Sequence, residues 1–307
     1  MTFEAADRVD SVPPSGIRRF FELAEEMDDI ISLGVGEPDF SAPWAAREAA
    51  IASLERGQTS YTANRGKREL RERIADYEAA THDLQYDHDE EILVTAGASE
   101  GLDLAFRALL NPGDSIAIAQ PCYVSYVPGA TFAGIDVIDV PTRAADEFKL
   151  TREVLESSGA ADADALVYCY PNNPTGATMT AEEMASVAAF CRENDLLVFA
   201  DEIYADLTYE HDHTSIATLP GMRERTVVFN GFSKAFAMTG FRLGYAMAPP
   251  EAIEAMNRIH QYSMLSAPTT AQHAAIEALD NCRDEVTDMA AQYDRRRKYV
   301  LTRFEEM

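Results

Sequence analysis

Residues 230–244, which read NGFSKAFAMTGFRLG, contain the side chains best suited to do chemistry. Lys234 lies on a Gly/Ser loop directly after an apolar run, and Arg242 follows eight residues later. Burial in apolar surroundings lowers the pKa of an amine and makes it nucleophilic. The chain's other lysines, none of which lies among glycines and apolar residues, are Lys67, Lys149 and Lys298. We therefore expect Lys234 to be a nucleophile in a cleft; the alternative is a solvated surface lysine.

A pair of carboxylates, Asp201 and Glu202, follows another apolar run, with Tyr204 close behind. A carboxylate at the end of a buried strand needs a cationic partner, because burying an unpaired charge is costly. The adjacent acids raise the alternative of a metal site. No nearby cysteine or histidine completes a ligand set, so no metal is predicted. His211 and His213 lie in a polar loop and are predicted to be solvated.

Three further segments carry candidate binding residues. Gly97, Ala98 and Ser99 open a predicted helix, where small residues let backbone amides approach an anion; the alternative is a plain turn that Ser99 caps. Tyr123 could offer a flat ligand a stacking face, or could be a core tyrosine. Asn173 lies in the rigid turn PNNPTG and offers both a donor and an acceptor, although such turns are also common in loops without function.

Apolar runs and amphipathic stretches alternate along the chain, and they must position these side chains. Strands are predicted at residues 30–35, 92–95, 115–119, 136–140, 165–170, 197–200 and 226–229. Helices are predicted at residues 16–27, 41–56 (capped by Ser41), 67–80, 99–110, 124–133, 152–157 and 181–194, and the part after residue 251 is mainly helical. This alternation predicts an α/β fold whose mostly parallel sheet is flanked by helices. Such sheets bind ligands at the carboxyl ends of their strands, and five of the candidate segments each follow a predicted strand.

Together these motifs resemble those of pyridoxal-phosphate (PLP) aminotransferases of fold type I, class I/II. In that family the lysine forms a Schiff base with the cofactor and moves the proton, which implies this role for Lys234. The resemblance further implies catalytic roles for Asp201 at the pyridine nitrogen and for Tyr204 at the phenolic oxygen. The remaining cofactor-binding residues that it implies are Gly97, Ala98, Ser99, Tyr123, Asn173, Ser233 and Arg242. Ser233 is included although many family members carry their serine three residues before the lysine, where this chain has Gly231.

Two upstream segments extend the resemblance, which runs from about residue 32 to about residue 279. The loop at residues 34–40, GVGEPDF, resembles the one whose glycine amide meets the substrate carboxylate, so Gly36 joins Asn173 as a substrate-binding candidate. The segment at residues 61–66, YTANRG, resembles the one that reaches across a dimer to the partner's phosphate, which makes Tyr61 a cofactor-binding candidate.

The function that this resemblance implies is transamination between an L-amino acid and a 2-oxo acid by a PLP-dependent homodimer with shared active sites. The alternatives are a PLP-dependent C–S β-lyase of the same fold and a non-catalytic PLP-fold paralogue. A regulator is disfavoured because no basic DNA-binding segment is present. A degraded copy is disfavoured because Lys234, Asp201, Tyr204, Asn173 and Arg242 are all retained.

The composition of the chain limits the kinds of partner and the cellular compartment that we expect. The formal net charge is −26, which argues against nucleic acid as a partner. No apolar run reaches membrane-spanning length and no signal-peptide pattern opens the chain, so we expect no membrane association and a cytoplasmic location. Scattered cysteines without CxxC spacing indicate free thiols in a reducing compartment. Acidity spread along the chain, with few lysines, resembles the surface of halophilic proteins; an ordinary acidic protein is the alternative.

The predicted domain organisation follows the resemblance. Residues 1–41 would form an N-terminal arm and the start of a small domain, residues 42–283 the large PLP-binding domain, and residues 284–307 a linking helix. Family members normally continue through a small-domain sheet to an arginine that clamps the substrate carboxylate. We therefore expect the small domain to be incomplete and the chain to be truncated at its C-terminus.

Overall fold

The computed structural model describes residues 3–14 and 36–307. Within these residues, seven strands form one sheet in the order β1-β7-β6-β5-β4-β2-β3. The strands are β1 (Ile92–Thr95), β2 (Ser115–Gln120), β3 (Asp136–Pro141), β4 (Ala165–Tyr168), β5 (Leu197–Asp201), β6 (Thr226–Gly231) and β7 (Gly244–Met247). All except β7 confirm predicted strands. The helix predicted at residues 16–27 and the strand predicted at residues 30–35 lie outside the described residues.

The strand β7 is the element that the sequence pattern does not predict. It lies between β1 and β6 and is antiparallel to both. The remaining pairs, from β6 across to β3, are parallel. All four residues of β7 are buried, so it lacks the alternation that marks a half-exposed strand. The sheet is therefore mostly parallel, as predicted, with one antiparallel insertion.

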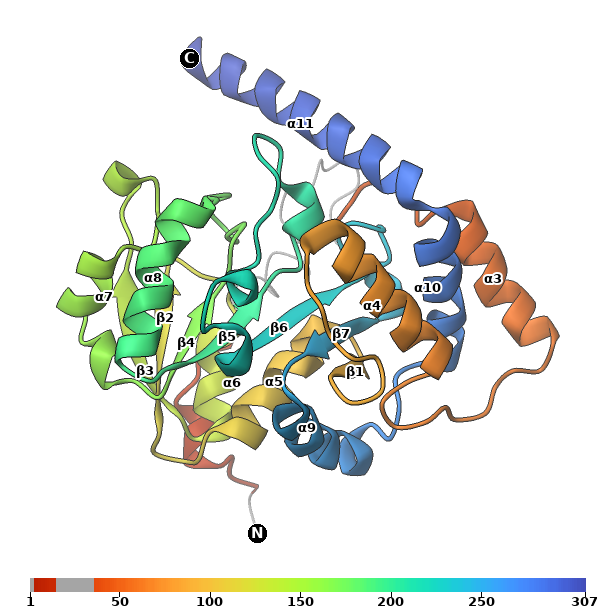
Figure 1. Cartoon of the computed structure of the whole chain (residues 1–307), viewed down its shortest axis with the longest axis horizontal. Helices are drawn as coiled ribbons and strands as arrows, with labels where there is room; N and C mark the ends of the chain where they lie inside the picture. Colours follow the sequence, from red (N-terminus) through yellow and green to blue (C-terminus); the bar gives the residue numbers. More distant parts are fainter. Residues whose placement is uncertain (1–2, 15–35) are drawn as a thin grey trace.

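The helices form a layer on each face of the sheet (Figure 1). They are α1 (Asp7–Asp10), α3 (Trp44–Glu55), α4 (Arg68–His82), α5 (Ala98–Leu109), α6 (Tyr126–Ala133), α7 (Arg152–Ser157), α8 (Ala181–Glu193), α9 (Pro250–Ser263), α10 (Thr269–Asn281) and α11 (Arg283–Glu305). Alternate strand residues enter two separate cores, as Ile92 and Val94 do on one side and Leu93 does on the other. Helices α4, α8 and α10 pack on the first core, and α5, α6 and α9 on the second. This arrangement confirms the α/β fold.

The start of α3 differs from the prediction, and the end of α11 extends away from the sheet. The predicted helix at residues 41–56 begins at Trp44, and its N-cap is Pro43 with no side-chain cap bond, so the predicted capping role of Ser41 is wrong. Proline has a fixed φ and no N–H to satisfy, which suits it to a helix start. At the other end of the chain, α11 runs past α10 and away from the sheet (Figure 1), and Tyr299 and Phe304 on its last turns are exposed.

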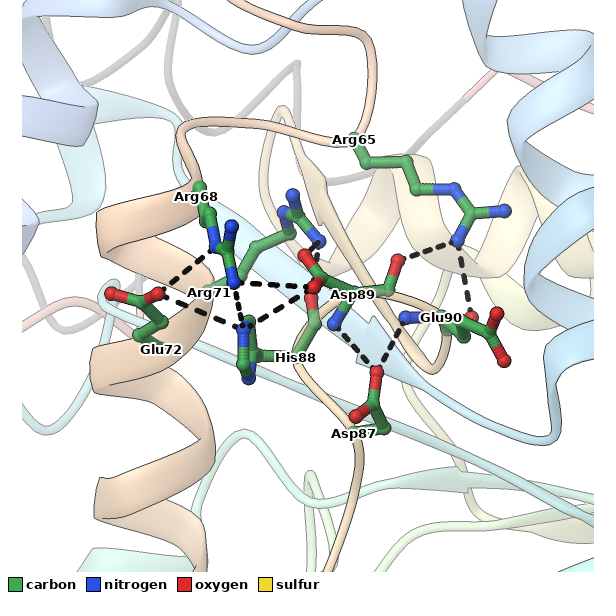
Figure 2. Close-up of polar contacts among 8 residues, drawn as sticks. All are labelled: Arg65, Arg68, Arg71, Glu72, Asp87, His88, Asp89 and Glu90. Atoms are coloured by element: carbon green, nitrogen blue, oxygen red, sulfur yellow. Dashed lines mark hydrogen bonds and ion pairs between the residues drawn. The ribbon is translucent and has the colours of Figure 1, made fainter.

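A polar network joins α4, the loop before β1 and the segment that follows Tyr61 (Figure 2). Arg65 Nη1 donates to the carbonyl oxygens of Asp89 at 2.8 Å and Glu90 at 3.2 Å. From α4, Arg71 donates to the carbonyl oxygen of His88 and lies 3.5 Å from the Asp89 carboxylate. The two arginines thus clamp the same loop from different segments, and Arg65 fixes its own segment to the residues that lead into β1.

Candidate active site

A cavity of about 640 Å³ opens at the carboxyl ends of the parallel strands. Its lining includes ten of the predicted site residues: Gly36, Ala98, Ser99, Tyr123, Asn173, Asp201, Tyr204, Ser233, Lys234 and Arg242. Gly97 lies directly behind this lining, beside Arg242. Of the residues predicted for the site, only Tyr61 lies elsewhere. The sequence motifs that follow separate strands therefore converge on one cavity.

Lys234 follows β6 and points into the cavity. Its Nζ donates to the carbonyl oxygen of Gly36 at 2.5 Å, and lies 5.7 Å from the centroid of the Tyr204 ring. Burial lowers the pKa of the Lys234 amine and outweighs the opposing effect of Glu37 and Asp201. A lowered pKa increases the fraction of neutral, nucleophilic amine. The structure thus places the amine where the sequence predicts a nucleophile.

Asp201 is buried at the end of β5 and interacts with a residue that the sequence reading missed. Tyr126, in the first turn of α6, donates its hydroxyl proton to Asp201 Oδ2 at 2.6 Å, and the backbone N–H of Ile203 donates to Oδ1 at 3.3 Å. Burial raises the pKa of Asp201, and the Tyr126 hydrogen bond opposes the rise. A carboxylate in this position favours a cation in the cavity beside it. Tyr126 lies three residues after Tyr123 and lines the same cavity, so its position close to a predicted site residue was a usable signal.

Aromatic and amide groups line the cavity around Asp201. Asn173 Nδ2 donates to the Tyr204 hydroxyl oxygen at 3.4 Å. Burial raises the pKa of Tyr204, so its hydroxyl keeps its proton and remains a donor. The Tyr123 ring meets the Tyr126 ring edge-on at 5.5 Å between centroids. Tyr204 and Asn173 therefore present a donor pair on the same side of the cavity.

An anion-binding cup lies at the start of α5. Gly97 is its N-cap residue with φ of 84°, and a Cβ at this position would lie 2.9 Å from Arg242 Nη2. The helix begins at Ala98, so the first-turn amides have no partner within the helix. Arg242 Nη1 donates to the carbonyl oxygen of Thr239 at 3.0 Å, which orients the guanidinium. Helix amides and a guanidinium together suit a phosphate.

Tyr61 lies on a separate face, and its side chain is 80% exposed. Its segment is held against residues 265–269: Asn64 Nδ2 donates to the carbonyl oxygen of Leu265 at 2.7 Å, and Thr269 Oγ1 donates to that of Ser60 at 2.8 Å. Tyr61 therefore does not contribute to the cavity of its own chain.

The expectation for His213 can be compared with the geometry. The prediction that His213 is solvated is wrong, because it lies in the interior and its Nε2 is 3.0 Å from Glu202 Oε2. Among the residues that the structure describes, no three or more histidine, cysteine, aspartate or glutamate side chains are grouped so that they could hold a metal ion. None of the helices described is long and apolar enough to cross a bilayer.

The residues of the cavity fit PLP. A phosphate suits the cup at Gly97 and Arg242, a protonated pyridine nitrogen suits the buried Asp201, and an aldehyde needs an amine of lowered pKa such as that of Lys234. The three groups line one cavity, as a single ligand would require.

Residues 28–307 match the model of the family "Aminotransferase class I and II". The chain belongs to this family. It is 49% identical to the putative aminotransferase YugH of Bacillus subtilis, over 100% of this chain and 80% of that protein. It is 41% identical to the aspartate aminotransferase of Pyrococcus abyssi, over 98% of this chain and 78% of that protein. The structure of the aromatic aminotransferase from Pyrococcus horikoshii superposes with a TM-score of 0.88 at 40% identity, over 95% of this chain and 78% of that one.

The protein is thus a PLP-dependent aminotransferase that transfers an amino group between an amino acid and a 2-oxo acid. This confirms the function and the cofactor expected from the sequence. The relatives' names differ between aspartate and aromatic amino acids, so they do not select one substrate for this aminotransferase. They give no support to the C–S β-lyase alternative.

Proposed function

We propose that Lys234, Asp201 and Tyr204 are the catalytic residues of this aminotransferase. The observation that carries this proposal is that a lysine of lowered pKa, a buried carboxylate and an oriented arginine line one cavity at the strand ends. The residues proposed to bind the cofactor around them are Gly97, Ala98, Ser99, Tyr123, Asn173, Ser233 and Arg242.

Bound PLP supplies an electron sink that lowers the barrier to removing the α-proton of an amino acid. Lys234 Nζ would take that proton and return it to the cofactor side, because the amine is desolvated and its pKa is lowered. The Asp201 carboxylate would hold the positive charge on the ring nitrogen. The Tyr204 hydroxyl and the Asn173 amide would donate to the phenolic oxygen. Arg242 and the α5 amides would bind the phosphate.

Gly36 and Asn173 are proposed to receive the carboxylate of the amino acid. Both line the cavity, and Gly36 already contacts Lys234 through its carbonyl oxygen. The donor can be identified by mixing holoenzyme with each amino acid and following the loss of absorbance of the lysine-bound cofactor. We expect at least one amino acid to consume the signal and to yield its 2-oxo acid without free ammonia. Release of ammonia and pyruvate from a thioether amino acid, with no such half-reaction, would instead identify a lyase.

We further propose that the enzyme is a homodimer in which Tyr61 reaches the cofactor phosphate of the partner. Tyr61 is exposed on the segment at residues 60–64, which is fastened to residues 265–269, and a dimer would cover it. A complementation experiment tests this arrangement. Lys234→Ala and Tyr61→Ala variants are each expected to have low activity. Mixed subunits should regain activity, because one site then combines an intact Lys234 with an intact Tyr61. Failure to regain activity after verified subunit exchange would show that Tyr61 does not act across the dimer.

We also propose a cytoplasmic location and a division of the chain into residues 1–41, 42–283 and 284–307. Four free cysteines, three of them buried, support a reducing cytoplasm. The division into a large domain at residues 42–283 and a linking helix at residues 284–307 is supported by the sheet and helices α3 to α10, which fall within the first range, and by α11 (Arg283–Glu305), which covers most of the second.

A further inference from the structure

A buried carboxylate of α4, Glu78, lies beneath the active-site loops without touching the cavity. It is fully buried, on the first-core face of the helix, on a stripe with Leu70, Ile74 and His82. Its Oε1 accepts hydrogen bonds from Tyr245 Oη at 2.5 Å and from Asn230 Nδ2 at 3.0 Å. Its Oε2 has no hydrogen-bond partner among the residues described. A buried acid is costly, so a specific role is expected for it.

The two donors to Glu78 lie on different strands, directly opposite each other. Asn230 of β6 pairs with Tyr245 of β7 in the antiparallel register. One oxygen atom of α4 therefore ties together a facing pair of residues near the ends of two strands.

The catalytic and the phosphate-binding segments emerge next to this pair. After Asn230 the chain runs through Gly231 to Lys234, and Asn230 Oδ1 also accepts the backbone N–H of Gly231 at 2.7 Å. Before Tyr245 the chain runs back through Gly244 to Arg242. Gly231 and Gly244 are the next facing pair, so close that a Cβ on Gly231 would lie 2.7 Å from Gly244 Cα.

Gly244 also contacts the anion-binding cup. A Cβ on Gly244 would lie 2.5 Å from the backbone nitrogen of Ala98 and 2.7 Å from the carbonyl carbon of Gly97. A shift of β7 relative to β6 would therefore move the Arg242 segment against both Lys234 and the start of α5. In a packed interior such a shift is transmitted to its neighbours and not absorbed by free space.

We propose that Glu78 is a positioning residue that fixes Lys234 and Arg242 relative to each other by clamping Asn230 and Tyr245. The clamp holds the distance between the amine and the guanidinium, and so between the groups that take the aldehyde and the phosphate of the cofactor. This inference rests on the proposed roles of Lys234 and Arg242.

The surroundings of Glu78 indicate which substitution should preserve the clamp. Burial raises the pKa of Glu78, opposed by His82 and by the Tyr245 hydrogen bond, while Asp206 and Glu202 add to the rise. The charged groups that face it are thus one histidine and two acids. A neutral side chain with an acceptor oxygen should therefore serve in its place, and Glu78→Gln keeps such an oxygen whereas Glu78→Leu does not.

The test compares these two variants in the holoenzyme. The readouts are the pH titration of the lysine-bound cofactor's absorbance, the dissociation constant for PLP and the half-reaction rate. Displacing a catalytic group by about 1 Å costs on the order of 100-fold in rate. We expect Glu78→Leu to shift the absorbance titration, to weaken PLP binding about tenfold or more and to slow the half-reaction by 10- to 100-fold. Glu78→Gln should stay close to wild type in all three.

A matched control is Ile74→Ala, one turn earlier on the same buried stripe. It should lower the melting temperature without moving the absorbance titration, because it removes apolar packing and leaves both hydrogen bonds to Glu78 in place. The inference is overturned if Glu78→Leu keeps the wild-type titration and PLP affinity, or if Ile74→Ala shifts them equally.

Two further measurements keep the outcomes distinct. If Glu78→Leu does not fold, Asn230→Ala cuts the link to the Lys234 loop and leaves the Tyr245 bond in place; wild-type behaviour of Asn230→Ala then overturns the inference. Reductive labelling of wild type shows separately whether Lys234 carries the cofactor. A label on another lysine would contradict the proposed function. A label on Lys234, together with wild-type behaviour of Glu78→Leu, would contradict only the proposed role of Glu78.

Discussion

Removal of one hydroxyl group, in Tyr126→Phe, tests whether Asp201 controls the chemistry. The Tyr126 hydroxyl donates to Asp201 Oδ2 at 2.6 Å, and both side chains are buried. A hydrogen bond to a charged group contributes about 1.5–3 kcal/mol. Because the Tyr126 hydrogen bond opposes the effect of burial, loss of this bond should raise the pKa of Asp201 further. The Ile203 amide still donates to Oδ1, so the carboxylate keeps its orientation.

As a consequence, the Asp201 carboxylate should stabilise the positive charge on the ring nitrogen of the cofactor less strongly. If the whole loss reaches the transition state, α-proton removal slows by about 10- to 100-fold, since each 1.36 kcal/mol is a factor of ten in rate. Stopped-flow absorbance of a single half-reaction measures this step directly. PLP affinity should fall less, because the phosphate and Lys234 contacts are untouched.

Tyr168→Phe supplies the matched control. Tyr168 is also fully buried, but among the described residues its hydroxyl hydrogen-bonds only to the sulfur of Met179, at 3.7 Å. It should therefore keep the wild-type half-reaction rate. Equal rates for Tyr126→Phe and Tyr168→Phe would refute the view that the Tyr126 bond tunes Asp201.

Three other predictions concern charge. Asp201→Ala should retain PLP and strongly slow α-proton removal in single-turnover kinetics; unchanged rates would refute its role. Burial alone would lower the pKa of His82, but Asp206, Glu78 and Glu202 raise it to about 9. This stabilisation, at most about 3 kcal/mol, is complete below the unfolded pKa of about 6.5 and is lost as pH rises through about 9. In His82→Gln, the free energy of unfolding measured with urea should fall less as pH rises through about 9. An unchanged fall would show that His82 is not its source. The net charge of −26 should make the melting temperature rise from low to molar KCl, and a flat or falling curve would contradict the halophilic interpretation.

The motifs at the strand ends could be predicted because both the types of their residues and their positions after apolar runs indicate a binding site. Each candidate segment follows an apolar run, and the ends of parallel strands meet at one edge of the sheet. The structure accordingly brings Asn173, Asp201 and Lys234 into one cavity. The antiparallel insertion of β7 could not be read in the same way, because strand order depends on long-range pairing and β7 is a short run buried throughout.

The supporting residues were harder to predict than the lining residues. In α4, opposite charges suggest a solvated helix, yet Glu78 and His82 continue the stripe of Leu70 and Ile74 into the interior. The four-residue spacing was a usable signal, but the partners on other elements were not visible in the sequence. Tyr126 was missed for the same reason, because its partner Asp201 lies on a distant strand.

The most direct test of the central claim is borohydride reduction of the holoenzyme followed by peptide mapping. Reduction makes the link between the cofactor and its lysine permanent, so mass spectrometry identifies the residue. The structure predicts a single label on Lys234, the lysine whose pKa burial lowers inside the cavity. Lys234→Ala should take up no label. A label on Lys67, Lys149 or Lys298 would contradict the account.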